Sequence, residues 1–478
     1  MDTKKLRQKI LDLAIRGKLV PQDPNDEPAS VLLERIRAEK EQLIKEGKIK
    51  RSKKSTATDK SHYENVPFEI PKNWVWCKLD DLAFYKKGPF GSSLTKSMFI
   101  PDNRNAYKVY EQKNAIQKDS NLGHYFISSE KFQELKGFEV LPNDIIVSCA
   151  GTIGETYIMP SDIRSGIINQ ALMIIRLHNI DITPFYLLYF DFILKNEAGK
   201  DGKGTAIKNI PPFDILKNYW IPLPPLAEQD RIIKEVALWQ RLIDSIDGNI
   251  EDIFKLSKKT KSKILDLAIS GKLVPQDPED EPAIELLKRI NPGFEPCDNS
   301  HYENLPFEIP STWVWVSHND MLEISGGAQP PKSEFSEVMK PGYIRLYQIR
   351  DYGEKPIPIY IPLSTASKTT VKGDILLARY GGSLGKVFIA EDGAYNVAMA
   401  KVILCYPEVL NQKFVYYYYL SSIYQNKLRS ISRTAQAGFN SGDFEDMYFP
   451  LPPLEEQGRI VDAISSIWEM IDMITAEL

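Results

Sequence analysis

The chain has 478 residues, a net charge of −4, 43% hydrophobic residues and 26% charged residues. This length is too great for one hydrophobic core and predicts two or more domains. The composition excludes a disordered chain, and no run of residues approaches the ~20 apolar positions of a membrane span. The N-terminal residues do not resemble a signal peptide, so we expect a cytoplasmic protein. The four cysteines lie far apart in the sequence, which argues against a zinc site or a disulfide framework.

Long segments of the chain occur twice. The repeated pairs are KILDLAIRGKLVPQDPNDEPA at Lys9–Ala29 and Lys263–Ala283, HYENVPFEIPKNWVW at His62–Trp76 and His301–Trp315, and IPLPPLAEQDRIIKEV at Ile221–Val236 and Phe449–Ile464, with small differences between copies. A repeat of this length is far longer than a solenoid unit and indicates a duplicated pair of domains.

The two copies are circularly permuted. The first proline-rich copy continues past Asp252 into the KILDLAI segment, whereas the second copy ends at Leu478. The continuation that the second copy lacks stands at the start of the chain, in Met1–Pro24. We therefore predict that the first and last segments pack together and close a pseudo-dimer. Such symmetry suits a ligand that is itself nearly two-fold, as DNA half-sites are for dimeric proteins.

Residues 1–60 are predicted to form a helical segment that packs with the C-terminal helix, followed by a basic linker at Lys45–Lys60. The linker has few hydrophobic residues, so we expect it to be solvated. Residues 61–220 form a first domain. It contains a strand at Trp74–Trp76, a glycine-rich turn at Lys86–Ser93, a buried strand ending in glycines at Asn143–Gly154 and a helix at Pro184–Asn196.

Residues 221–299 form a central helical region. From Ile232 through Ile253 its apolar residues are spaced alternately by four and three, with Trp239 in this register, and the spacing continues through polar residues to Leu267. Such spacing is typical of a coiled coil; a helix packed on its own domain is the alternative. We expect it to pair antiparallel with the matching residues at 449–478 and near the N-terminus. The paired helices would form a spacer of roughly 60 Å at ~1.5 Å per residue.

Residues 300–448 repeat the plan of the first domain with a different sequence. They contain a strand at Trp313–Trp315, a glycine-rich turn at Ser325–Ser333, a buried strand with glycines at Gly373–Gly385 and a helix at Gln412–Leu428. Because strands dominate and the helices are short, we predict an α/β fold for both domains. Tyr107–Asn114 aligns with Ile344–Asp351, which pairs Lys108 with Arg345, Tyr110 with Tyr347 and Lys113 with Arg350.

Cations and hydrogen-bonding aromatic residues on short strands and turns suit contact with phosphates and base edges. Solvated strand faces with buried tyrosines are the structural alternative. The candidate DNA-binding residues are Lys86, Lys87, Ser92, Ser93, Lys108, Tyr110, Lys113, Lys208, Lys332, Arg345, Tyr347, Arg350, Arg379 and Arg433. The glycine turns Gly151–Gly154 and Gly382–Gly385 could cradle a phosphate or could simply allow close packing of backbones.

Motifs for catalysis are missing from the sequence. There is no methyltransferase Asn/Asp-Pro-Pro-aromatic segment, phosphate loop, zinc-protease helix or Gly-x-Ser-x-Gly elbow. Pro101-Asp102 followed by Glu111-Gln112-Lys113 fits the loose pattern of metal-dependent nucleases, but Gln348 replaces Glu111 in the second copy. We therefore predict a DNA reader with no catalytic residues, cofactor or metal site of its own.

The doubled P-L-P-P-L-x-E-Q-x-R-I element, the paired helices, KGPFGSS and GTIG resemble the specificity subunit of type I restriction-modification systems. The resemblance implies two target recognition domains, each reading half of a split DNA site. It implies partners as well: two methyltransferase subunits and restriction subunits, which would carry S-adenosylmethionine, ATP and Mg. Residues that match the conserved entry to the helices are Pro224, Pro225, Glu228, Gln229, Pro452, Pro453, Glu456 and Gln457.

Because the two domains differ in sequence, we expect two different half-sites and an asymmetric DNA site, with a gap set by helix length. Several alternatives stay open. The chain could serve a methyltransferase-only or type IIB-like complex, or be a metal-dependent nuclease or a methyltransferase itself. It could also be a coiled-coil scaffold whose domains bind protein or glycan.

Overall fold

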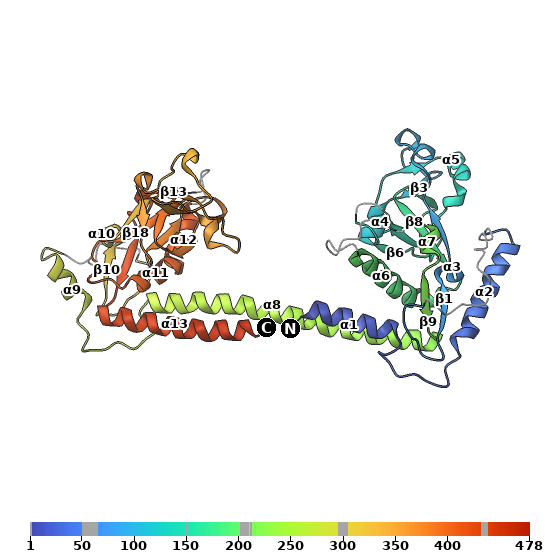
Figure 1. The fold of residues 1–478 in the computed structure, drawn as a ribbon, viewed down its shortest axis with the longest axis horizontal. Coiled ribbons are helices and arrows are strands. Elements are labelled where there is room, and N and C mark those ends of the chain that lie inside the picture. The colour runs from blue at the N-terminus through green and yellow to red at the C-terminus, as the bar shows by residue number, and fades with distance from the viewer. Residues whose placement is uncertain are drawn as a thin grey trace. The chain divides into compact units, whose positions relative to one another are not determined.

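The computed structural model describes residues 2–49, 66–149, 152–200, 210, 213–294, 305–431 and 438–478. The chain divides into two compact units, Asp2–Asp247 and Gly248–Leu478. Each unit contains an α/β domain and one pair of long helices (Figure 1). Most of the predicted basic linker lies outside the described residues. In the ranges given above, no helix has the length and apolar character needed to cross a membrane.

The first unit holds the first α/β domain and the start of the long helix α8 (Leu226–Ile269). Its other elements are α1 (Thr3–Ile15), α2 (Ala29–Lys45), β1 (Val75–Lys78), α3 (Leu79–Leu82), β2 (Ala83–Lys87), β3 (Tyr107–Tyr110), α4 (Gln112–Gln117), β4 (Phe126–Ile127), α5 (Ser129–Glu134), β5 (Ile145–Ser148), β6 (Thr156–Ile158), β7 (Gly166–Ile168), β8 (Leu172–Leu177), α6 (Thr183–Lys200), α7 (Phe213–Leu216) and β9 (Trp220–Leu223). The strands form sheets in the orders β2-β8-β5-β6, β4-β3-β7 and β1-β9. Only the β3–β7 pair among them is parallel within the described chain.

The second unit repeats this plan after the end of α8. Its elements are α9 (Ala283–Ile290), β10 (Val314–Ser317), α10 (His318–Met321), β11 (Leu322–Gly326), β12 (Tyr343–Tyr347), β13 (Tyr360–Pro362), β14 (Thr369–Thr370), β15 (Ile375–Ala378), β16 (Val387–Ile389), β17 (Gly393–Tyr395), β18 (Met399–Leu404), α11 (Gln412–Leu420), α12 (Ser422–Ile431), β19 (Tyr448–Leu451) and α13 (Leu454–Ala476). The sheets are β11-β18-β15-β16, β13-β12-β17-β14 and β10-β19. The predicted α/β fold of both domains is confirmed. The helix predicted at Gln412–Leu428 is two helices, because Ser421 adopts an extended backbone with ψ of 166°.

Each half of α8 packs against a shorter antiparallel helix. In the first unit, Ile10 and Ala14 of α1 share a buried cluster with Ile232, Val236 and Ile243 of α8. Arg7 of α1 links the two helices, because it donates to both Asp244 and Asp247 of α8 at 2.8 Å. The antiparallel pairing predicted from the apolar spacing is confirmed here, but the helix on which α1 packs is α8 and not the C-terminal helix that we predicted for residues 1–60.

In the second unit, α13 packs against the other half of α8. Ile264 of α8 shares the buried core with Ile460 and Ile464 of α13, and Lys261 binds Asp472 at 2.5 Å. The predicted coiled-coil contact is only partial at Trp239 and Ile253, which are 37% and 36% exposed.

A buried carboxylate joins three chain segments in each unit. In the first unit, Glu228 at the start of α8 accepts from Gln22 Nε2 at 2.6 Å and from Trp74 Nε1 at 2.9 Å. Arg231, one turn further along α8, donates to both oxygens of Asp26 in the loop after α1. We call the Gln22–Trp74–Glu228 set the clasp, because it ties the loop, the entry to the domain and the helix together.

The second clasp repeats the first in atomic detail. Glu456 accepts from Gln276 Nε2 at 2.6 Å and from Trp313 Nε1 at 2.9 Å, and Arg459 donates to Asp280. Both oxygens of each carboxylate face hydrogen-bond donors. Burial raises the pKa of both carboxyls, although the Trp and Gln donors oppose that shift. These contacts give a physical reason for the repetition of Gln, Trp and Glu at matching positions.

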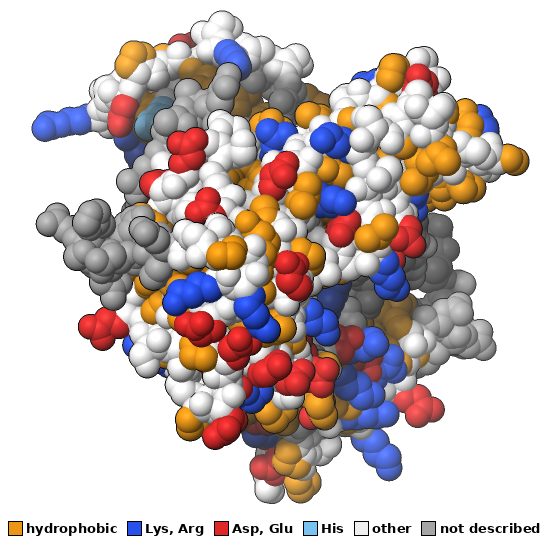
Figure 2. Space-filling view, turned by 90° about the vertical axis from the view of Figure 1, so that its left-hand side faces the viewer, with side chains coloured by type: hydrophobic (Ala, Val, Ile, Leu, Met, Phe, Trp, Pro, Cys, Tyr) orange, Lys and Arg blue, Asp and Glu red, His pale blue; other side chains and the backbone are white. Residues whose placement is uncertain are grey.

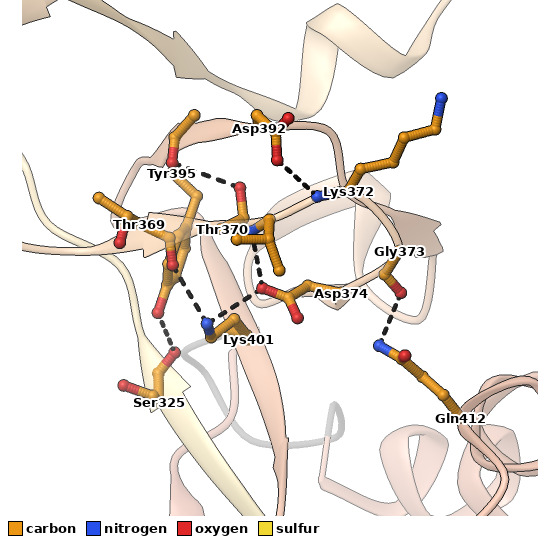
Figure 3. A network of polar contacts seen from close by, with 12 residues as sticks. Ser325, Thr369, Thr370, Lys372, Gly373, Asp374, Asp392, Tyr395, Lys401 and Gln412 are labelled. Atoms are coloured by element: carbon orange, nitrogen blue, oxygen red, sulfur yellow. Dashed lines mark hydrogen bonds and ion pairs between the residues drawn. The ribbon is translucent and has the colours of Figure 1, made fainter.

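An acidic residue at the start of the central strand braces each domain core. In the first domain, Arg176 of β8 donates to both oxygens of Asp144. In the second domain, Lys401 of β18 binds Asp374 at 3.0 Å, and that carboxylate also accepts from the Val371 amide (Figure 3). The cation comes from the same neighbouring strand but from a position two residues away along it, as the strand registers show.

Candidate nucleic-acid interface

Three turns meet at the ends of the strands in the first domain. They follow β2, β5 and β7, and backbone hydrogen bonds join them. These bonds run from Gly88 N to Leu172 O at 3.0 Å, from Cys149 N to Ala171 O at 2.7 Å and from Asn169 N to Tyr110 O at 2.9 Å. We call the surface that these turns form, with the side chains they carry, the strand-end face.

The second domain has the same strand-end face. Its turns follow β11, β15 and β17. The bonds run from Gly327 N to Met399 O at 2.9 Å, from Arg379 N to Ala398 O at 2.9 Å and from Asn396 N to Tyr347 O at 3.1 Å. A glycine is required in the first turn of each face. A Cβ atom at Gly88 would lie 1.8 Å from the Asn169 carbonyl oxygen, and one at Gly327 would lie 2.1 Å from that of Asn396.

The two faces carry a cation on different turns. In the first domain Lys87 ends β2 and is exposed. Burial raises the pKa of the neighbouring Cys149 thiol, and the positive charge of Lys87 opposes that rise. The strand registers make Gly326 the counterpart of Lys87, and Arg379 the counterpart of Cys149. Arg379 Nη1 lies 2.6 Å from the place where a Gly326 Cβ would be. Each face therefore has a positive side chain near the same place, supplied by a different segment.

The other predicted turn residues lie beside these cations. Lys86 is half-buried with its ammonium group 4.6 Å from the Phe138 ring centroid, whereas Ser92 is exposed and Ser93 is half-buried. In the second domain Lys332 is exposed after the glycine turn. Lys208 and Arg433 lie outside the described residues. Lys87, Ser92 and Ser93 thus lie at the first turn, whereas the Lys86 side chain points to the other face of β2, toward Phe138.

Two predicted contacts on β3 must be corrected. Tyr110 is completely buried and its hydroxyl donates to the Arg164 carbonyl at 2.6 Å. Lys108 is only 5% exposed, and burial lowers its pKa. These side chains lie two residues apart on the same face of β3, where Tyr110 joins a buried cluster with Ile146 and Ile168. Neither can reach DNA in this conformation.

The remaining strand candidates have internal partners or lie at the rim. Lys113 binds Glu111 at 2.9 Å, and Arg345 binds the buried Asp351 at 3.3 Å. Tyr347 is half-buried with the Arg345 guanidinium 5.0 Å from its ring centroid. Arg350 is exposed. As DNA-contacting residues these four stay predictions.

The carboxylates of the nuclease-like pattern form ion pairs with basic side chains. Asp102 binds Arg164 at 2.7 Å, and Glu111 binds Lys113. Across the described residues, no group of three or more His, Cys, Asp or Glu side chains is placed to hold a metal ion.

Charge on the molecular surface is mixed. Figure 2 shows basic and acidic side chains interspersed over much of one face, with apolar side chains among them. This distribution agrees with the small net charge of the chain. Contact with DNA phosphates would therefore depend on local groups such as Lys87 and Arg379.

Sequence reasoning missed two features of the strand-end face. The first is Phe90, whose side chain is largely exposed in the first glycine turn. The second is the pair Gln170 and Val397, which are exposed at equivalent positions on the third turn of the two domains. The signal for Phe90 was its place between glycines in KKGPFGSS. The turn at Asn169 gave no comparable signal, because it joins the face only through tertiary hydrogen bonds.

Two duplicated α/β domains carried on paired helices, with matching strand-end faces, define a doubled recognition protein. The family model for the type I restriction modification DNA specificity domain matches residues 71–253 and 310–478. The chain belongs to this family and is a specificity subunit of a type I restriction system.

Known relatives agree with this assignment. The chain is 31% identical to the EcoAI specificity subunit of Escherichia coli in an alignment of 403 residues that covers 70% of this chain and 65% of that subunit, just under two thirds. It is 25% identical to the EcoEI specificity subunit of Escherichia coli, over 99% of this chain and 90% of that one.

Two solved structures share the fold. One is the HsdS subunit from Thermoanaerobacter tengcongensis, with a TM-score of 0.51 and 18% identity over 86% of this chain and 93% of that chain. The other comes from work on complex assembly and conformational transition of the type I R-M system. Its TM-score is 0.53 at 19% identity, covering 86% of this chain and 94% of that chain.

Proposed function

We propose that each strand-end face reads one half of a bipartite, asymmetric DNA site, and that the chain itself catalyses no reaction. The observation that carries this proposal is the repetition of one backbone frame with different side chains. Three hydrogen-bonded turns hold the same positions in both domains, while Lys87, Phe90 and Gln170 of one face correspond to Gly326, Gln329 and Val397 of the other. Different side chains on a shared frame suit the reading of different bases.

Methylation and cleavage would belong to partner subunits, which would bind S-adenosylmethionine, ATP and Mg. Two methyltransferase subunits and the restriction subunits are the partners that this division of labour requires. Exposed apolar side chains on the long helices support docking of a partner protein. In the first unit these include Leu238, Trp239 and Leu242 of α8, and in the second unit Met470, Met473 and Ile474 of α13.

The gap between the half-sites would be set by α8. This helix has 44 residues, which correspond to about 66 Å at ~1.5 Å per residue. Because α8 belongs to both units, its length, and not either domain, would determine which spacing of half-sites can be read.

A domain exchange within the chain tests the proposal. The first and last strands of each domain pair with each other in the same register. Lys78 lies opposite Trp220 in the first domain, and Ser317 lies opposite Tyr448 in the second. Replacing residues 79–219 by a copy of residues 318–447 should therefore preserve both ladders. In cells that supply the methyltransferase partner, we expect methylome sequencing to show one altered half-site, now equivalent to the half read by the second domain.

The matched control is the unaltered chain with the same partner. A change in both halves of the motif would contradict independent reading by the two domains. Methylation or cleavage by the isolated chain supplied with S-adenosylmethionine, ATP and Mg would contradict the assignment of catalysis to other subunits.

A further inference from the structure

Phe90 stands out among the apolar side chains of the strand-end face. It is 87% exposed, the largest value for a large hydrophobic side chain in the described part of the chain. Single exposed apolar residues are common on protein surfaces and need no explanation by themselves. Phe90 differs because the turn that carries it is bonded to the domain just before the ring, at Gly88.

Backbone contacts shape the turn that carries Phe90. Gly88 is bonded to the Leu172 carbonyl, and Pro89 next to it is buried. After the ring, the Ser93 amide donates to the Phe90 carbonyl at 2.8 Å and closes a short 3₁₀ turn. Gly91 lies beside the third turn of the face, since a Cβ atom there would lie 2.7 Å from Gln170 Oε1. The turn is therefore anchored to the domain at Gly88 and presents the ring to solvent.

The surroundings of Phe90 are polar. Lys87, Ser92 and Gln170 are all exposed on the same or the adjoining turn. A docking site for protein would be expected to surround a central aromatic residue with further apolar side chains. One aromatic ring flanked by a cation and hydrogen-bonding groups instead matches duplex DNA, where phosphates and base edges surround apolar base faces.

We propose that Phe90 is a wedge that inserts against a base step of the first half-site and partly unstacks it. The proposal rests on the proposed function, in which this face contacts DNA. Lys87 would hold a neighbouring phosphate while the ring replaces part of the base-stacking contact. The apolar area of the ring, which is exposed to water in the free chain, becomes buried only in the complex.

The second domain has no aromatic ring at the position equivalent to Phe90. The position equivalent to Phe90, two residues after the paired glycine, is Gln329, whose amide donates to the Pro330 carbonyl at 3.3 Å. An amide can pair with the edge of an adenine but cannot separate stacked bases. The two half-sites are therefore treated differently: the first is deformed and the second stays stacked.

Fluorescence of 2-aminopurine tests this difference. The complete complex of this chain with its methyltransferase partner is bound to duplexes carrying 2-aminopurine at successive positions of both half-sites. We expect one base step in the first half-site to brighten with the wild-type protein and to stay dark with Phe90→Ala. Brightening that persists in Phe90→Ala comes from base extraction by the methyltransferase and is subtracted.

Binding measurements complete the test. Phe90→Ala should bind the cognate duplex about tenfold to a hundredfold more weakly, with unchanged thermal unfolding, because the ring makes no buried contact. Ile180→Ala, which removes another exposed apolar side chain of the same unit, should bind like wild type. Two results would overturn the wedge proposal and leave the proposed function intact. One is cognate binding by the wild type in which the fluorescence of no base step depends on Phe90. The other is equal affinity of the wild type and Phe90→Ala for the cognate duplex. Failure of the wild-type complex to prefer any cognate sequence would overturn the proposed function as well.

Discussion

The clasps and the strand-end faces are both duplicated, but they are preserved in different ways. In the clasps the side chains themselves are repeated, and the Gln–Glu and Trp–Glu distances agree between copies. In the strand-end faces only the backbone bonds are repeated, and the side chains differ. The chain thus fixes the attachment of each domain with side-chain chemistry, and leaves the chemistry of the face free to vary on a fixed backbone.

The physical reason lies in burial. A carboxylate with both oxygens facing buried donors tolerates few replacements, because any loss leaves polar groups unpaired. The strand-end face needs only amides, carbonyls and one glycine in its first turn, so its outward side chains carry no structural constraint. Even the cation there has moved between turns, from Lys87 in one domain to Arg379 in the other.

Shortening α8 should produce the largest effect, because it alters the spacing of both faces without touching either. Removal of one heptad keeps the four-and-three spacing of the apolar residues. The structure shows that only α8 spans both units, so deletion of 243–249 alone is sufficient. Ile250 then takes the place of Ile243, and Glu251 that of Asp244 opposite Arg7, which preserves the pairing with α1.

We expect methylome sequencing of this deletion variant to show both half-sites unchanged and a gap shorter by a few base pairs. Trimming 471–477 alone removes Asp472 and with it the ion pair to Lys261, but should leave the gap as it was. An unchanged gap in the α8 variant would refute the idea that this helix sets the spacing.

Glu228→Gln should produce the next largest effect. The new amide places an NH₂ group against either the Trp74 indole N–H or the Gln22 amide, so one buried donor loses its acceptor. We expect a loss of about 2 kcal/mol in the free energy of unfolding, measured with denaturant. Glu456→Gln is the matched variant and should lose a similar amount, because the contacts are the same. A large difference between the two variants would show that the clasps are not equivalent.

The pH dependence provides a second readout of the clasp. Because the folded-state pKa of both carboxyls lies above the ordinary 4.5, the folded protein binds protons more tightly than the unfolded chain. The free energy of unfolding of the wild type, relative to the Gln variants, should therefore rise as the pH falls from neutral to 4.5. An opposite slope would contradict this direction of the shift.

Lys87→Ala should produce the smallest effect. Loss of one phosphate contact should weaken cognate and non-cognate binding alike by about three- to tenfold and reduce the slope of log affinity against log salt by about one. The recognised sequence should not change. Lys18→Ala, at an exposed lysine in the loop after α1, is the control with equal charge loss. A changed methylation motif in Lys87→Ala would mean that this residue reads bases.

The sequence predicted what depends on local pattern. The strands at Trp74–Trp76 and Trp313–Trp315, the antiparallel helices and the α/β class all follow from repeats and spacing. The pairing of Tyr110 with Tyr347 also agrees with the strand registers. Burial of Tyr110 and exposure of Trp239 could not be predicted, because they depend on which elements cover a strand or helix. The strand-end face was only partly predicted, since its three turns meet through hydrogen bonds between distant segments.

The continuity of α8 gives the protein an angular constraint in addition to a length. Each residue added to or removed from a helix turns everything beyond it by 100°, whereas a heptad restores the original direction to within about 20°. Duplex DNA turns as well, once in about 10 to 10.5 base pairs. If the two domains read half-sites as proposed, a change in α8 would have to satisfy two rotations at once, and a mismatch would be absorbed by twisting the duplex between the half-sites. We therefore expect that only certain gap lengths can be read. These are the lengths at which the rotation along α8 matches the rotation of the duplex between the half-sites.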